Sequence, residues 1–270
     1  MKDFNFKENY RIEDLLKIME ILRAPGGCPW DAEQTHESIK ANFIEETYEV
    51  IEAINKQDND LLLEELGDVL LQVVFHTEME KEKGAFTFDD VADGICKKLI
   101  ERHPHVFGDV TVSSTDEVLS NWDAIKRKSK AQKTQGSSML KVPKELPALM
   151  RAEKIQSKAK KAGFDWDDMS GALTALESEI KELKEAIATK KQNEIKEEFG
   201  DVLFSCVNVA RFIDVDAEEA LTVSNEKFIS RYLVVEKLAE ERGINMKETS
   251  IEELDKLWDE AKIILKSNRG

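Results

Sequence analysis

The chain has 270 residues, with 39 basic and 55 acidic side chains and a formal net charge of −16. This length allows one large domain or two ordinary ones, each able to bury a core. The acidic excess argues against non-specific binding of DNA or RNA, so we expect no nucleic-acid partner. No run approaches ~18 consecutive apolar residues, and residues 1–6 lack an apolar signal core. We therefore expect a cytoplasmic protein without a membrane partner.

Two long stretches, residues 30–103 and 148–270, contain no proline. An interior proline costs a helix ~3 kcal/mol, so these stretches are where long helices are expected. Both are rich in Glu, Lys, Leu and Ala, with apolar residues at three- and four-residue spacing. The apolar run 69–75 has helical flanks and no turn residues, which favours a buried helix over a strand. The predicted fold class is all-α.

Between these stretches, residues 127–138 are polar, basic and rich in turn formers, and Pro143 and Pro147 follow. This composition is typical of a linker. We predict an N-terminal helical domain at 1–130, a polar linker at 131–148 and a C-terminal helical domain at 149–270.

An internal repeat supports two related domains. Residues 44–54 match residues 177–187, and residues 64–70 match residues 197–203. Both matches have the same offset of 133 residues, as from Glu46 to Glu179.

Carboxylates dominate the repeated segments. Glu46 and Glu49 are three residues apart, as are Glu65 and Asp68, so each pair shares one face of a helix. A short connection around residues 56–60 would make the two helices antiparallel neighbours and bring the carboxylates together. The second half repeats the set as Glu179, Glu182, Glu198 and Asp201.

Converging carboxylates repel one another unless they are protonated or bridged by cations. Hard oxygen ligands of this kind suit Mg²⁺ or Mn²⁺. Solvated, charged helix faces are the alternative for one copy of the pattern. The second copy keeps the same 16-residue separation, from Glu49 to Glu65 and from Glu182 to Glu198, which argues against chance.

A glycine precedes the aspartate in both copies, at Gly67 and Gly200. Glycine inside a helix costs ~1 kcal/mol relative to alanine. It allows either a ligand or neighbouring helix to approach the backbone, or close helix packing without any ligand. The sequence leaves both interpretations open.

The segment Glu45-Glu46-x-x-Glu49, followed by Glu65-x-x-Asp68, resembles the EExxE…ExxD signature of the MazG-type nucleoside triphosphate pyrophosphohydrolases. The likeness covers nearly the whole chain, including residues 27–31, 102–107 and 225–228. It implies two tandem all-α bundles and a homodimer in which helices of two chains complete each bundle. It also implies Mg²⁺-dependent hydrolysis of a nucleoside triphosphate to the monophosphate and pyrophosphate, with Mn²⁺ as a substitute metal.

The resemblance implies functional roles for the residues of this sequence that match the family motif. The implied metal ligands are Glu46, Glu49, Glu65, Asp68, Glu179, Glu182, Glu198 and Asp201. Metal held there would neutralise the triphosphate and activate a water for attack on the α-phosphorus. Ser178 departs from the pattern, since the motif's first glutamate is absent there. The second half is favoured as the principal hydrolase, and the first as a structural, regulatory or weaker site.

Basic and aromatic residues downstream are candidates for substrate contacts. Those of the second half are Asn225, Lys227, Arg231, Trp258 and Lys262, and we assign catalytic roles to Lys227 and Arg231 together with the second-half carboxylates. Their first-half counterparts are Lys98, Arg102, Trp122 and Lys126, of which Lys126 is included among the substrate-binding candidates. The tryptophans either stack on a base or pack in the core. Stacking tolerates every base, so we expect broad base specificity.

Other hydrolase classes fit less well. The chain has no GxxxxGK loop and no His-Asp dipeptide, which disfavours P-loop and HD-type enzymes. Only one ExxH occurs, at residues 33–36, whereas di-iron bundles use two. The Nudix box is incomplete because Asn193 stands at its arginine and Glu179 at its opening glycine. The remaining alternative is a non-catalytic helical protein that binds nucleotides or regulates a partner.

Overall fold

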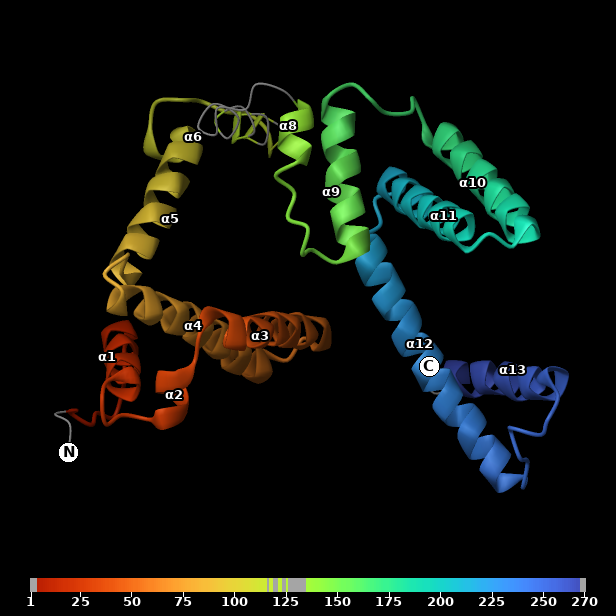
Figure 1. Cartoon of the computed structure of the whole chain (residues 1–270), viewed down its shortest axis with the longest axis horizontal. Coiled ribbons are helices and arrows are strands. Elements are labelled where there is room, and N and C mark those ends of the chain that lie inside the picture. Colours follow the sequence, from red (N-terminus) through yellow and green to blue (C-terminus); the bar gives the residue numbers. More distant parts are fainter. Residues whose placement is uncertain (1–3, 116, 119–120, 123–124, 126–134, 268–270) are drawn as a thin grey trace. The chain divides into compact units, whose positions relative to one another are not determined.

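The computed structural model describes residues 4–115, 117–118, 121–122, 125 and 135–267. The elements in these ranges are helices joined by loops and turns, with no strand, so the all-α prediction is confirmed (Figure 1). The chain divides into two compact units, Met1–Lys130 and Ala131–Gly270. Among the described helices, none combines the length and the apolar character that crossing a bilayer requires.

The first unit contains α1 (Ile12–Arg23), α2 (Pro29–Glu33), α3 (His36–Lys56), α4 (Asn59–Glu82), α5 (Phe88–Arg102) and α6 (Pro104–Phe107). Helices α3 and α4 pack against each other as a hairpin. Gln57 ends α3 in the left-handed conformation, with φ 56°. The Asp58 carboxylate accepts hydrogen bonds from the backbone amides of Asp60 and Leu61 in the first turn of α4. This tight turn makes the two helices antiparallel neighbours, as the short connection predicts.

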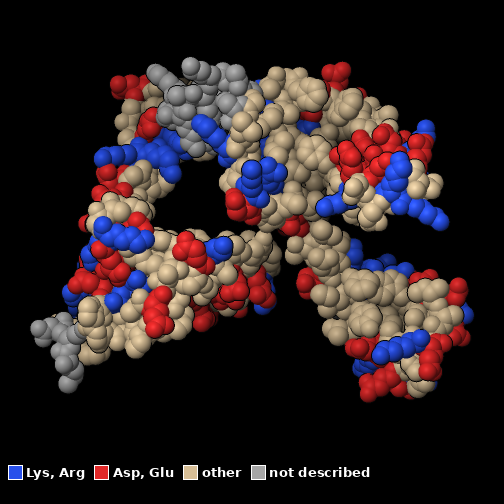
Figure 2. Space-filling model, viewed as in Figure 1, with Lys and Arg blue, Asp and Glu red and all other residues tan. Residues whose placement is uncertain are grey.

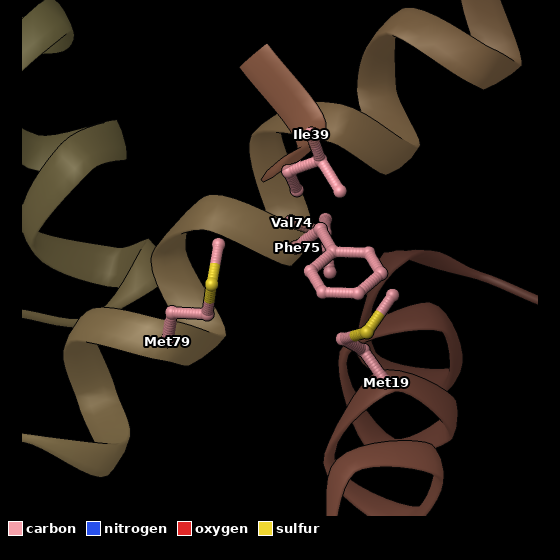
Figure 3. Packing of buried hydrophobic residues seen from close by; sticks show 5 residues of the cluster. All are labelled: Met19, Ile39, Val74, Phe75 and Met79. Carbon is pink, nitrogen blue, oxygen red and sulfur yellow. The ribbon is translucent and has the colours of Figure 1, made fainter. Parts of the chain in front are cut away.

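A cluster of five buried apolar residues joins α1 to this hairpin (Figure 3). Met19 of α1 and Ile39 of α3 meet Val74, Phe75 and Met79 of α4. Val74 and Phe75 end the apolar run 69–75, which lies within α4, so the predicted helix is confirmed. Its C-terminal end is buried, whereas Leu70 is 38% exposed. The cluster anchors the end of the hairpin that lies away from its turn.

The second unit contains α8 (Gln135–Met139), α9 (Ala148–Lys161), α10 (Met169–Thr189), α11 (Gln192–Phe212), α12 (Ala217–Glu241) and α13 (Ile251–Ser267). Helices α10 and α11 form a second hairpin. Lys190 turns it with φ 59° and stands 133 residues after Gln57, so the left-handed turn repeats with the sequence. The predicted linker 131–148 contains the short helix α8, which packs against α9.

A separate buried cluster fastens α13 to α12. It consists of Val235, Leu238, Ala239, Leu257 and Ala261, with Trp258 packed against its edge. The main packing partner of α13 is α12, while α12 itself contacts α9 and α11. The second unit therefore presents two elements that carry predicted site residues, the α10–α11 hairpin and the α12–α13 pair.

Candidate active site

Each hairpin brings three of its four predicted carboxylates together. Helix α3 supplies two of them and α4 the third, and in the second unit α10 and α11 do the same. One oxygen atom from each carboxylate lies within 4.8 Å of the others in the sets Glu46, Glu49, Glu65 and Glu179, Glu182, Glu198. Figure 2 shows acidic side chains gathered over the α10–α11 hairpin.

The predicted aspartates lie one helical turn beyond the third glutamate. Asp68 and Asp201 are outside the two sets of closest oxygen atoms. Their charges still reach those sets, because Asp68 raises the pKa of Glu46 and Asp201 raises the pKa of Glu179. Each hairpin thus holds three convergent carboxylates and a fourth at the margin.

Partial burial and mutual repulsion disfavour the ionised carboxylates. Burial is the largest cause of the raised pKa of Glu65, which is 9% exposed, and the charges of Glu49 and Asp68 add to it. In the second hairpin, burial and then the charge of Glu182 raise the pKa of both Glu179 and Glu198. In both hairpins, therefore, burial and repulsion between neighbouring carboxylates raise glutamate pKa values.

Among the described residues, no ion pair relieves that repulsion in either set. In the ranges that the structure describes, no lysine or arginine forms an ion pair with any of the eight predicted ligands. Oxygen-only donors with unrelieved negative charge fit a hard divalent cation such as Mg²⁺ or Mn²⁺. The residues present thus suit the metal that the sequence predicts.

One hydrogen bond distinguishes the second hairpin from the first. The Ser178 hydroxyl donates to Oε1 of Glu182 over 3.0 Å. The equivalent position in the first hairpin is Glu45, whose ionised side chain cannot donate. Sequence reasoning treated Ser178 only as a missing carboxylate, although the i, i+4 spacing of Ser178 and Glu182 already places the two side chains on one helix face.

The predicted substrate-binding residues of the second half gather on the α12–α13 pair. The Arg231 guanidinium lies 5.6 Å from the Trp258 ring centroid, within the range of a cation–π contact. The Phe228 ring lies 5.1 Å from the same indole, a contact that sequence reasoning missed. Lys262 pairs with Asp259 on its own helix, and Asn225 and Lys227 are exposed on α12.

These residues form no hydrogen bond or ion pair with the second-half carboxylates in the described part of the chain. The first half repeats the aromatic contact, since Arg102 lies 4.9 Å from the Trp122 ring centroid. Lys126 lies outside the described residues. The structure therefore presents carboxylate and basic–aromatic groups as two separate elements.

The helical glycines leave open space beside the aspartates. A Cβ atom built at Gly67 or at Gly200 would meet nothing within 4 Å, leaving out each glycine's own chain neighbours and its own helix backbone nearby. Packing within the described part of each unit therefore does not account for its glycine. Of the two interpretations left open by the sequence, approach of a ligand or of a helix from outside the unit agrees better with this geometry.

Comparison with known proteins matches the same segments. A family model described as "MazG nucleotide pyrophosphohydrolase domain" matches residues 34–107 and again residues 169–236. The chain is 48% identical over 250 residues to the Thermotoga maritima protein named nucleoside triphosphate pyrophosphohydrolase/pyrophosphatase MazG, covering 93% of this chain and 95% of the relative. It is 44% identical over 255 residues to the Escherichia coli K12 nucleoside triphosphate pyrophosphohydrolase, covering 93% and 97% of the two chains.

Proposed function

The chain belongs to the MazG family of nucleotide pyrophosphohydrolases, and we propose that it hydrolyses nucleoside triphosphates. The products are the nucleoside monophosphate and pyrophosphate, and the reaction requires Mg²⁺. The observation that carries the proposal is the convergence of three glutamate oxygen atoms in each hairpin, without a protein cation beside them in the described ranges. Mn²⁺ serves as a substitute metal, because both ions accept carboxylate ligands.

The second hairpin is the proposed site of hydrolysis. Glu179, Glu182, Glu198 and Asp201 hold the metal, which when bound offsets triphosphate charge and activates water. The raised pKa of Glu179 and Glu198 reflects partial burial and the repulsion between neighbouring carboxylates, so cation binding is favoured there. The attack falls on the α-phosphorus, and pyrophosphate is the leaving group.

Basic residues of α12 and α13 bind the phosphates in this proposal. Lys227 and Arg231 stand one turn apart on α12, so both can face one anion. Lys262 exchanges Asp259 for a phosphate oxygen, and Asn225 donates an amide hydrogen bond. Trp258 offers an aromatic face to the base, already held by Phe228 and Arg231. An aromatic face reads no base edge, so we propose broad base specificity.

A second copy of the chain completes each bundle in this proposal. Apolar side chains flank the site glycines on the exposed helix surfaces, and they repeat between the halves. Leu66 and Phe199, at equivalent positions, are 50% and 53% exposed, and Leu70 and Leu203 follow one turn later at 38% and 43%. A monomer would leave these two strips in water, whereas a homodimer of this chain buries them.

The direct experiment is to incubate the full chain with each common nucleoside triphosphate, with and without Mg²⁺. We expect release of monophosphate and pyrophosphate from several triphosphates, and loss of turnover in excess EDTA. Undiminished turnover in EDTA would contradict the metal requirement. Binding of nucleotides without any hydrolysis would instead favour the non-catalytic alternative, and a preference of several orders of magnitude for one base would contradict broad specificity.

Sedimentation tests the homodimer independently. Phe199→Lys places a charge in the exposed strip of α11, at a side chain that is 53% exposed in the isolated chain. We expect the wild-type chain to sediment as a dimer and the variant to dissociate. A wild-type chain that is monomeric and fully active would contradict the proposed homodimer.

A further inference from the structure

Four other hydroxyl groups inside the described helices bond to their own backbone. Thr47, Thr174, Thr222 and Ser230 each donate to the carbonyl oxygen four residues earlier. This is the usual partner of a serine or threonine inside a helix. Ser178 differs, because its hydroxyl donates forward to Oε1 of Glu182.

The target of that hydrogen bond is one of the three convergent glutamates. Glu182 is exposed, so its carboxylate has freedom of rotation that the neighbouring backbone does not restrict. A hydroxyl donor 3.0 Å from Oε1 restricts the rotation of this carboxylate, one oxygen atom of which belongs to the convergent set. Serine also carries no charge, so it adds nothing to the repulsion that raises the pKa of Glu179 and Glu198.

The first hairpin lacks this arrangement. Glu45 occupies the equivalent position and is exposed, and no hydrogen bond joins it to Glu49 among the described residues. Glu45 adds one negative charge beside a set that already contains three carboxylates. The two halves therefore differ in how the second glutamate of the motif is held.

We propose that Ser178 is a positioning residue of the second site, which orients the Glu182 carboxylate toward the metal through a hydrogen bond to Oε1. The inference rests on the proposed function, since Glu182 has a ligand to hold only if the second site binds metal. Groups that hydrogen-bond to metal ligands commonly contribute about 10- to 100-fold to metal affinity.

Mn²⁺ binding by the full-length chain tests this role without relying on activity. A Glu65→Gln background weakens the first site, so that electron paramagnetic resonance of free Mn²⁺ reports on the second. In this background we expect Ser178→Ala to weaken Mn²⁺ binding about tenfold. Ser178→Thr should retain most of the affinity, because threonine keeps the hydroxyl. Thr174→Ala is the matched control, because it removes a hydroxyl one turn earlier on α10 that bonds only to the Ser170 carbonyl.

Steady-state kinetics distinguish an effect on the metal from a general effect on the structure, because the two would change the dependence on Mn²⁺ and on nucleotide differently. The Mn²⁺ concentration for half-maximal turnover should rise about tenfold in Ser178→Ala. The KM for nucleotide at saturating Mn²⁺ should stay near that of the parent. Unchanged Mn²⁺ affinity in Ser178→Ala, or equally weak binding in Ser178→Thr, would overturn the role of Ser178 while leaving the proposed function standing. Absence of Mn²⁺ binding by the Glu65→Gln parent would overturn both.

Discussion

The two halves hold the same acidic set in the same hairpin, yet they differ in the side chains around it. Both gather three glutamate oxygen atoms within 4.8 Å of one another, and both turn the hairpin through a left-handed residue. The second half replaces the charged Glu45 by Ser178, which hydrogen-bonds Glu182. A duplicated acidic hairpin can thus be kept in both copies while the side chains beside its carboxylates diverge.

The largest expected effect is the loss of turnover when the matched glutamates of the two halves are replaced one at a time. Glu198→Ala should lower activity by at least about 100-fold, the upper range for losing a group that merely supports a metal ligand. Glu65→Ala should spare much of the activity, because we propose hydrolysis in the second half. Steady-state pyrophosphate release measures both. If Glu65→Ala is the lethal change instead, the assignment is reversed and Ser178 marks a decayed site.

A smaller effect is expected at the matched arginines. Arg231→Ala should lower kcat/KM about 30-fold, since truncating the charged partner of a desolvated anion costs ~2 kcal/mol or more. Arg102→Ala, which removes the corresponding contact to Trp122 in the first half, is the control and should change kcat/KM little. Equal losses in the two variants would show that both halves bind substrate.

The metal-free chain should show a pH dependence that is alike in both halves. A carboxyl whose pKa is raised by folding contributes stability below its unfolded pKa and loses it as the pH rises through its folded pKa. The pKa of Glu65 and of Glu198 is raised from an ordinary 4.5. Glu65→Gln and Glu198→Gln should therefore each raise the melting temperature at pH 7 in EDTA, and the gain should vanish below about pH 4.5.

Thermal unfolding of each variant across pH 4 to 8 gives the comparison. A gain from only one variant would mean that the repulsion is relieved in the other half. Lower melting temperatures for both variants at pH 7 would contradict unrelieved repulsion altogether.

The smallest expected effect concerns the glycines. Because a Cβ would meet nothing within 4 Å, Gly67→Ala and Gly200→Ala should each stabilise the fold by about 1 kcal/mol through helix propensity. Gly200→Ala should also slow turnover, since its methyl group enters the open space beside Asp201. Thermal unfolding and pyrophosphate release measure the two quantities. Full activity in Gly200→Ala would show that neither substrate nor a second chain approaches there.

The hairpins could be predicted from the sequence because their signals are local. The three-residue spacing of Glu46 and Glu49 defines a helix face, and the short segment around Asp58 closes the turn. The contacts of Trp258 with Phe228 and Arg231 could not be predicted from local spacing, because α12 and α13 meet through residues far apart in the sequence. The direction of the Ser178 hydroxyl was equally hidden, since a helical serine has two competing acceptors.

Isotope tracing of the attacked phosphorus tests the central claim most directly. The full chain is incubated with a nucleoside triphosphate and Mg²⁺ in H₂¹⁸O, and the masses of the products are measured by mass spectrometry. Glu198→Ala is the inactive control. The account predicts one ¹⁸O atom in the monophosphate and none in the pyrophosphate, because water attacks the α-phosphorus. Label in the pyrophosphate, or release of orthophosphate as the first product, would contradict it.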